Sequence, residues 1–412
     1  MDLHEVCDLI VDCEHKTAPT QAEGYPSIRT PNIGRGYFLL DGVNRVSEET
    51  YRSWTRRAEP KPGDLIMARE APVGNVAMVP AGLRPCLGQR TLLIRPMRSK
   101  VFPRYLAYLL IGDQIQNIIH AMTNGVTVPH LNMKDVRSLP LPPLPPLPTQ
   151  RKIAAILSAY DDLIENNLRR IKILEEMAQN LYREWFVKFR FPGWEKARFV
   201  DSPLGKIPEE WEVTTINKVT SYINRGVTPK YDASASSLVV NQKCIRDRKL
   251  NLSLARQHKS RVMDDKYVVF GDILINSTGV GTLGRVAQVY EDLNDVTVDT
   301  HVSIVRPSNG DGIDFLGLAL IDLEPHFESL GAGATGQTEL RRDRIGETEI
   351  VLPPVKMRKQ FSEKVTSLRK LVLNLAARNE TLRRTRDLLL PKLISGEVDV
   401  SELDIAIPEE AA

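Results

Sequence analysis

An internal duplication constrains this chain of 412 residues more than any other feature of its sequence. The segment LPPLPTQRKI at 144–153 aligns with LPPVKMRKQF at 352–361, an offset of 208 residues. The same offset relates PGDLIMA to FGDILIN and NGVTVPHL to AGATGQTEL, and LLIRP matches SIVRP after three more residues. Ordered matches at a nearly constant offset predict a structural unit that occurs twice, each copy filling about half of the chain.

Each copy combines short strands with a helix. DLIMA, NVAMVP and RTLLIRP are short apolar runs bounded by Gly and Pro, which is typical of strands. The segment 103–122 follows with apolar residues at helical spacing and predicts one helix packed on the sheet. The second copy repeats the order with DILIN, GRVAQVY, THVSIVRP and DFLGLALIDL. These patterns predict two α+β domains.

A long heptad pattern follows each of these domains. Apolar residues fall at alternating steps of four and three over 153–185, interrupted by Asn167, and over 361–389, interrupted by Asn379. Two separate surface helices are one interpretation, but a strict 3.5-residue period over more than four heptads favours a coiled coil. Because the chain returns after an intervening domain, we expect the two helices to pair antiparallel. Asn167 opposite Asn379 would then fix the register.

The composition narrows the class of protein without identifying a partner. The formal charge of +3 permits a nucleic-acid partner but does not require one. The four cysteines lack a CxxC spacing, which predicts neither a disulfide framework nor a zinc site and is consistent with a reducing cytoplasm. The N-terminus lacks an apolar signal core, and no apolar run reaches the length of a membrane span. We therefore expect a cytoplasmic protein without a membrane partner.

The sequence contains no convincing catalytic or metal-binding motif. Gly279, Gly281 and Gly284 form G-x-G-x-x-G, but a strand pattern follows them where a dinucleotide site needs a helix, so a hairpin turn is favoured. No P-loop and no H-E-x-x-H motif occur. Two alternatives stay open: a nucleotide-dependent enzyme using the turn 279–284, and a scaffold whose PPLPPLP segment recruits a partner as a polyproline helix.

Two similar domains on paired helices suit the reading of two related DNA features at a set separation. Residues 153 to 185 would span about 48 Å as a helix, or roughly 14 base pairs of B-DNA. Polar loops in both copies carry residue types that reach phosphates and base edges. The candidate DNA-binding residues are Lys16, Thr17, Arg29, Asn32, Arg35, Gln89, Arg90, Thr127, Arg225, Thr228, Lys230, Asn241, Lys243, Asn276, Ser277, Thr278 and Gln337.

Three segments outside the polar loops make the chain similar to a known family. The first is LPPLPTQRKIAAILSAYDDLIENNLRRIKILEEMAQNLYREWFVKFRF, the second is GKIPEEWEV, and the third, late in the chain, is LLLPKLISGEVDVSEL. All three resemble the DNA-specificity subunit of Type I restriction-modification systems. The resemblance covers the whole chain. It implies two α+β target recognition domains separated by two long helices in an antiparallel coiled coil, with a pseudo-two-fold repeat of about 208 residues. The expected limits are 1–147 for the first recognition domain, 148–190 for the first spacer helix, 191–355 for the linker and second recognition domain, 356–395 for the second spacer helix and 396–412 for an acidic tail.

The resemblance also implies a division of labour with other subunits. The chain would bind double-stranded DNA at a bipartite site, one half-site per recognition domain, and would itself be non-catalytic. Two modification subunits with S-adenosylmethionine would methylate adenine, and restriction subunits would use ATP and Mg. We expect no cofactor and no metal bound directly by this chain.

Overall fold

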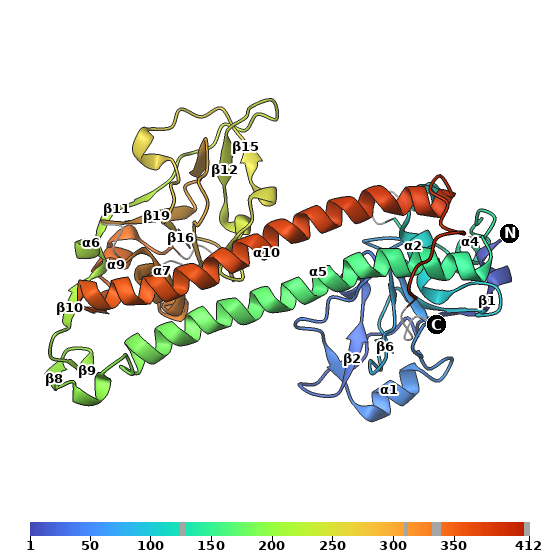
Figure 1. Cartoon of the computed structure of the whole chain (residues 1–412), viewed down its shortest axis with the longest axis horizontal. Coiled ribbons are helices and arrows are strands. Elements are labelled where there is room, and N and C mark those ends of the chain that lie inside the picture. The colour runs from blue at the N-terminus through green and yellow to red at the C-terminus, as the bar shows by residue number, and fades with distance from the viewer. Residues whose placement is uncertain (124–128, 309–311, 332–338, 408–412) are drawn as a thin grey trace. The chain divides into compact units, whose positions relative to one another are not determined.

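The computed structural model divides the chain into two compact units. Unit 1 comprises Met1–Asn167 with Ala377–Ala412, and unit 2 comprises Leu168–Ala376. The structure describes all residues except 124–128, 309–311, 332–338 and 408–412 (Figure 1). The described part contains both helices and strands in each unit, in agreement with the predicted α+β class. The domain limits given above stay a prediction.

The main sheet of unit 1 has the antiparallel order β1-β7-β4-β5. The runs DLIMA, NVAMVP and RTLLIRP form three of its strands, as predicted, and every residue of the central strand β4 is buried. Helices α2 and α3 supply much of the core on this sheet. The bounds are β1 (Cys7–Asp12), β7 (Thr91–Pro96), β4 (Leu65–Ala68), β5 (Val76–Met78), α2 (Pro103–Ile111) and α3 (Asp113–Met122).

The single helix predicted over 103–122 is wrong in one respect, because Gly112 divides it. Gly112 has extended dihedrals (φ −66°, ψ 145°), so α2 ends at Ile111 and α3 begins at Asp113. Glycine has a low helix propensity, and the sequence offered this one signal for the break. The break lets both helices bury apolar faces, including Leu109 and Ile115.

Unit 2 has a main sheet with the equivalent order, β11-β19-β16-β17, and all pairings are again antiparallel. Its first strand has a register irregularity between Thr220 and Tyr222, and β1 has one between Cys7 and Leu9. Helix α7 packs in the core of unit 2 as α2 does in unit 1. The bounds are β11 (Thr220–Arg225), β19 (Val302–Pro307), β16 (Ile273–Asn276), β17 (Val286–Gln288) and α7 (Ile313–Asp322).

Each unit adds a small three-stranded sheet with one parallel pairing. The orders are β3-β2-β6 in unit 1 and β15-β12-β18 in unit 2, with β2 parallel to β6 and β12 parallel to β18. The shared topology of both sheets supports the duplication seen in the sequence. The bounds are β2 (Tyr25–Ile28), β3 (Arg45–Val46), β6 (Cys86–Leu87), β12 (Leu238–Val240), β15 (Arg256–Gln257) and β18 (Val296–Val298). The other short elements are α1 (Glu48–Trp54), α4 (Met133–Arg137), α6 (Ile216–Val219), α8 (Glu324–Ser329), α9 (Arg342–Glu347), β13 (Ile245–Arg246) and β14 (Lys249–Leu250).

A buried ion pair braces the main sheet of both units in the same way. In unit 1, Arg95 donates to both carboxylate oxygens of Asp64, at 2.9 and 2.7 Å. In unit 2, Arg306 donates to both oxygens of Asp272, each at 2.8 Å. The hydrogen bonds raise the pKa of both guanidinium groups, and a bidentate pair of this kind is geometrically specific.

The two long helices contribute to the cores of both units and pair antiparallel within each. They are α5 (Leu147–Tyr182), extended by a π-helical turn Arg183–Val187, and α10 (Val355–Ser395). In unit 1, buried Asn167 donates from Nδ2 to Oδ1 of buried Asn379 at 2.8 Å, and Arg386 pairs with Asp161 at 2.5 Å. In unit 2, the Phe186 and Phe361 rings pack edge-on with centroids 4.8 Å apart. The predicted antiparallel coiled coil is therefore confirmed.

The proline-dense segment before α5 lies outside helices and strands and ends in a fixed joint. Gln150, in the first turn of α5, is buried and donates to Pro145 O at 2.8 Å. Its side-chain oxygen accepts from the N–H of Phe102 at 2.7 Å. At the equivalent position before α10, Arg358 donates to Pro353 O at 3.2 Å. In both units the first helical turn is thus tied back to the preceding proline segment.

The start of the range predicted as the linker and second recognition domain contains a hairpin and an aromatic anchor. Strands β8 (Phe199–Ser202) and β9 (Gly205–Pro208) pair with each other, and β10 (Glu212–Thr215) pairs with β20 (Glu349–Leu352). Phe191 is buried, whereas Trp194 is 40% exposed. Trp211 is the buried residue, in ring contact with Phe191 at 5.1 Å. The described part of the tail is also anchored, because Val400 is buried and Lys152 donates to Ser401 O.

Candidate nucleic-acid interface

The main sheet of unit 1 ends in a short backbone network. The N–H of Arg69, just after β4, donates to Arg90 O at 2.8 Å. The N–H of Leu131 then donates to Arg69 O at 3.0 Å. An isolated bridge joins Glu70 to His130. The backbone after β4 is thereby held between the residue before β7 and the segment that leads to α4.

Unit 2 repeats this network with different side chains. The N–H of Ser277, just after β16, donates to His301 O at 2.8 Å, and the N–H of Leu340 donates to Ser277 O at 2.8 Å. An isolated bridge joins Thr278 to Glu339. By these bonds, Arg69 corresponds to Ser277, Arg90 to His301, Glu70 to Thr278 and His130 to Glu339.

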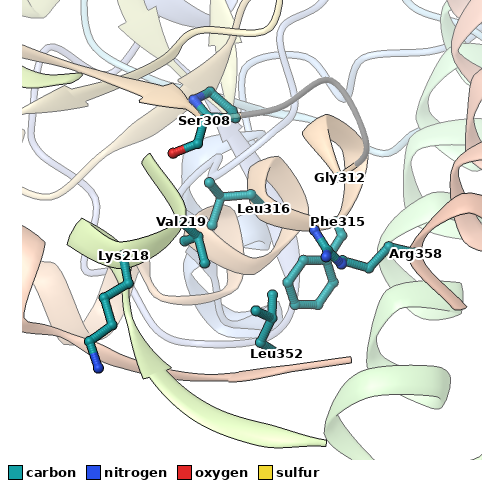
Figure 2. A pocket seen from close by; sticks show the side chains of 9 residues that line it. Lys218, Val219, Ser308, Gly312, Phe315, Leu316, Leu352 and Arg358 are labelled. Carbon is teal, nitrogen blue, oxygen red and sulfur yellow. The ribbon is translucent and has the colours of Figure 1, made fainter. Parts of the chain in front are cut away.

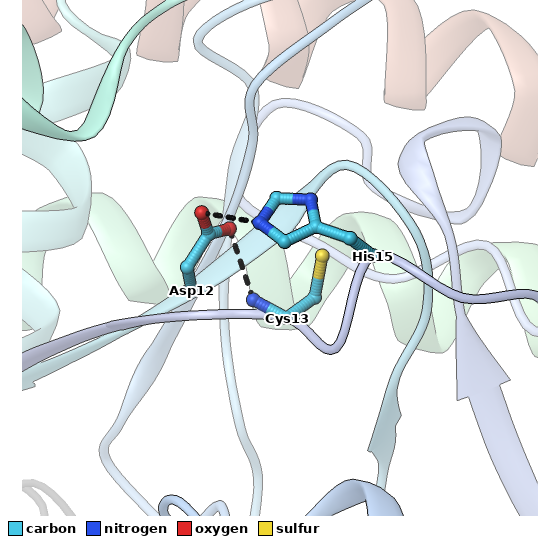
Figure 3. A group of neighbouring side chains, drawn as sticks. All are labelled: Asp12, Cys13 and His15. Carbon is cyan, nitrogen blue, oxygen red and sulfur yellow. Dashed lines mark hydrogen bonds and ion pairs between the residues drawn. The ribbon is translucent and has the colours of Figure 1, made fainter.

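Polar side chains in unit 1 form an ionic network on this backbone. Arg69 pairs with Asp12 at 2.5 Å, and the same carboxylate oxygen lies 2.8 Å from His15 Nε2. Figure 3 shows that the carboxylate of Asp12 points toward His15 and also accepts from the N–H of Cys13. Asp12, Cys13 and His15 bring possible metal-ligand atoms within 4.8 Å of one another. The guanidinium already balances the Asp12 charge, so this arrangement favours a structural network over a cation site.

An exposed pair lies beside that network. Arg90 contacts Glu70 at 2.9 Å, and the Arg90 side chain is 60% exposed. Arg90 has φ 65° and His15 has φ 56°, a left-handed conformation that is uncommon for residues other than Gly, Asn and Asp. Gln89 donates to His15 O at 3.4 Å. Two predicted residues, Gln89 and Arg90, thus lie together at the end of the sheet.

The equivalent place in unit 2 has a hydroxyl–imidazole pair. Thr278 Oγ1 lies 2.7 Å from Nδ1 of His301, whose side chain is exposed. Arg225 does not join this pair. It pairs with Glu339 at 2.7 Å and donates to Leu340 O at 3.0 Å. Arg225 therefore holds the segment before α9 against β11, and much of its charge is balanced internally.

The remaining predicted residues separate into exposed groups and loop-forming groups. Arg35 is exposed but engages Asp113 at 3.0 Å. Asn32 donates to Leu39 O, and Asn241 accepts from the N–H of Lys243, so both amides shape their own loops. The exposed side chains are those of Lys16, Thr17, Arg29, Thr228, Lys230 and Lys243. Thr127 and Gln337 lie outside the described residues.

The structure contradicts the predicted DNA contact for two residues, because their side chains are buried. Asn276 and Ser277 are fully buried. Asn276 donates to Gln242 O at 3.0 Å, and the Ser277 hydroxyl lies 2.6 Å from that of Ser303. Because neither side chain reaches the surface, both support the sheet and cannot contact DNA directly. His15, Glu70, His301 and Glu339 also lie at these strand ends and were not among the predicted residues, although the matched strand ends of the two copies point to this place.

Unit 2 has two further features apart from the strand ends described above, a glycine-rich turn and a hollow. The glycines at 279, 281 and 284 all have positive φ and turn the chain between β16 and β17, as predicted for a hairpin. A hollow of about 190 Å³ is lined by apolar side chains that include Phe315 and Leu352. Figure 2 shows these side chains. The rim of the hollow carries Lys218 and Arg358. Neither feature brings together groups for a reaction.

Comparison with known proteins identifies the chain's relatives. Residues 1–176 match the family model described as the Type I restriction modification DNA specificity domain. The Type I restriction enzyme MjaIX specificity subunit of Methanocaldococcus jannaschii is 26% identical over 376 residues, covering 89% of this chain and 84% of the relative. Over most of its length the chain is thus similar to specificity subunits of Type I restriction enzymes. The HindI specificity subunit of Haemophilus influenzae is 24% identical, covering 74% of this chain and 80% of the relative.

A solved structure has a fold similar to that of this chain. The Type I restriction-modification S subunit from M. genitalium superposes with a TM-score of 0.58 at 15% identity, covering 95% of each chain. This likeness supports the two-domain α+β fold with long helices. Across the described ranges of the chain, no helix has the length and apolar character needed to cross a membrane.

Proposed function

We propose that this chain is the DNA-specificity subunit of a Type I restriction-modification complex and reads a bipartite site. The observation that carries the proposal is the duplicated fold: two sheets of one topology in a chain whose relatives are named specificity subunits. Each unit would read one half-site. The different side chains at equivalent strand ends fit two half-sites of different sequence.

Affinity and discrimination come from different residues in this proposal. Exposed cations such as Lys16, Arg29 and Lys230 contact phosphates and supply affinity that falls with salt. A few groups at the sheet ends contact base edges and supply discrimination. The paired helices α5 and α10 set the length of the unread gap between the half-sites. Asn167 and Asn379 fix the register of that pairing.

The chemistry belongs to partner subunits, and this chain is non-catalytic. Two modification subunits bind S-adenosylmethionine and methylate adenine, and restriction subunits use ATP and Mg. The specificity subunit places these partners on the target. Because methylation requires a flipped adenine, the chain also helps to hold distorted DNA. The chain itself binds no cofactor or metal in this proposal.

Sequencing that detects methylated adenine tests this proposal. DNA from cells that contain the modification subunits is compared with and without this chain. A split adenine-methylated motif that appears only with the chain is the expected result. Methylation that does not depend on the chain, or a motif without an unread gap, contradicts the proposal.

A further inference from the structure

One side-chain pair, with one exposed and one half-buried member, occupies the same backbone position in both units but differs in chemistry. We call it the edge pair: Glu70 with Arg90 in unit 1, and Thr278 with His301 in unit 2. Arg90 directly precedes β7, and His301 directly precedes β19. Glu70 lies two residues after β4, and Thr278 lies two residues after β16. The two pairs are therefore structurally equivalent.

One ion pair within each main sheet and the backbone hydrogen bonds at the strand ends keep their chemistry between the units, although the adjacent Arg69 of unit 1 is replaced by Ser277 in unit 2. The bidentate ion pair of Asp64 with Arg95 recurs as Asp272 with Arg306. The backbone hydrogen bonds at the strand ends also recur with similar lengths. Features that maintain the fold are thus the same in both copies. The edge pair keeps its position and exchanges a carboxylate–guanidinium pair for a hydroxyl–imidazole pair.

Stability does not account for the edge pair of unit 1. The Arg90 side chain is 60% exposed, and an exposed ion pair usually contributes little to folding. The left-handed backbone of Arg90 adds a conformational cost. Glu70, only 23% exposed, orients the guanidinium through a single contact, which leaves further N–H donors facing solvent. An oriented, exposed guanidinium is the group that binds O6 and N7 of guanine in the major groove.

We propose that the edge pairs are specificity determinants. Arg90, positioned by Glu70, reads a guanine in the first half-site. His301, positioned by Thr278, reads a different base at the equivalent place in the second half-site. This inference rests on the proposed function and adds to it the residues that distinguish the two halves of the target.

Exchanging the edge pairs tests the inference in the assembled complex. The Glu70→Thr/Arg90→His double variant is expressed with the modification subunits, and its methylated motif is determined by sequencing. We expect one position of the first half-site to lose its guanine preference by about tenfold and to acquire the preference of the second half-site. The second half-site and the gap should not change. The reciprocal Thr278→Glu/His301→Arg variant should introduce a guanine into the second half-site only.

Two controls separate recognition from folding. Arg52→Ala removes a guanidinium that is 77% exposed and paired with Glu48, and it should leave the motif unchanged. If the double exchange abolishes methylation, Arg90→Lys decides, because Lys keeps the charge but loses the bidentate fork. A relaxed guanine preference with Arg90→Lys supports the inference, and an unchanged first half-site overturns it. A wild-type chain that directs no split motif contradicts the proposed function instead.

Discussion

The buried asparagine pair on the long helices allows a quantitative test of the coiled coil. Asn167 is 5% exposed and Asn379 is 1% exposed, and their amides are joined by a 2.8 Å hydrogen bond. Asn379 also donates to Ile164 O at 3.3 Å. Replacing Asn167 by Leu leaves the Asn379 Oδ1 without its donor in a buried site, which costs about 1–3 kcal/mol. Asn379→Leu leaves the Asn167 amide unpaired at a similar cost.

The double variant behaves differently, because both polar groups are removed together. Apolar groups of similar shape in place of both partners of a buried hydrogen bond are nearly neutral or stabilising. We therefore expect Asn167→Leu/Asn379→Leu to be at least as stable as the natural chain, with a coupling energy of about 0.5–3 kcal/mol between the two changes. The amides in the middle of both helices report this local stability by hydrogen–deuterium exchange.

A neighbouring residue gives the matched control for these variants. The substitution Asn166→Leu is chemically the same change one position away, on the exposed side of α5. It should alter the free energy of unfolding by less than about 0.5 kcal/mol. A double variant that is less stable than both single variants would refute the reasoning. It would show that the amide pair stabilises the helices instead of only fixing their register.

Three other outcomes follow from buried polar groups. Asp64→Asn removes the charge partner of Arg95 and should lower the free energy of unfolding by about 3–5 kcal/mol, measured as a lower guanidinium midpoint. Burial lowers the pKa of His258 below 6.5, so the unfolded chain takes up a proton first as the pH falls. Stability should therefore decrease below about pH 6.5, and less so in His258→Gln, as denaturation at a series of pH values would show. Gln150→Ala removes the acceptor of the half-buried Phe102 N–H and should cost about 1 kcal/mol, with a lower melting temperature; an unchanged melting temperature would contradict this role.

The sequence predicts the duplicated architecture well because its signals are local and periodic. The heptads indicate α5 and α10, and the apolar runs bounded by Gly and Pro indicate β4 and β16. The break at Gly112 and the hairpin β8–β9 were missed, because tertiary packing decides them against weak local signals. The position of Trp211 in the core likewise depends on contacts with distant rings.

The candidate site is less accessible to sequence reasoning than the fold. Asn276 and Ser277 are polar and follow a strand, yet the structure buries them, since the sheet end is covered by the Leu340 segment. Composition alone could not separate them from the half-buried Thr278 beside them. The edge pairs emerge only when the strand registers of the two copies are compared, which needs the backbone hydrogen bonds.

The central claim is that one half-site is read by each unit across a gap set by the long helices. Removing one heptad from each helix, 168–174 from α5 and 372–378 from α10, keeps the antiparallel register and shortens both helices by about 10 Å, or roughly three base pairs. A binding selection on DNA with randomised gaps measures the preferred gap of the variant complex. Our account predicts unchanged half-sites with a gap about three base pairs shorter. The same gap in the variant and the natural protein would contradict it.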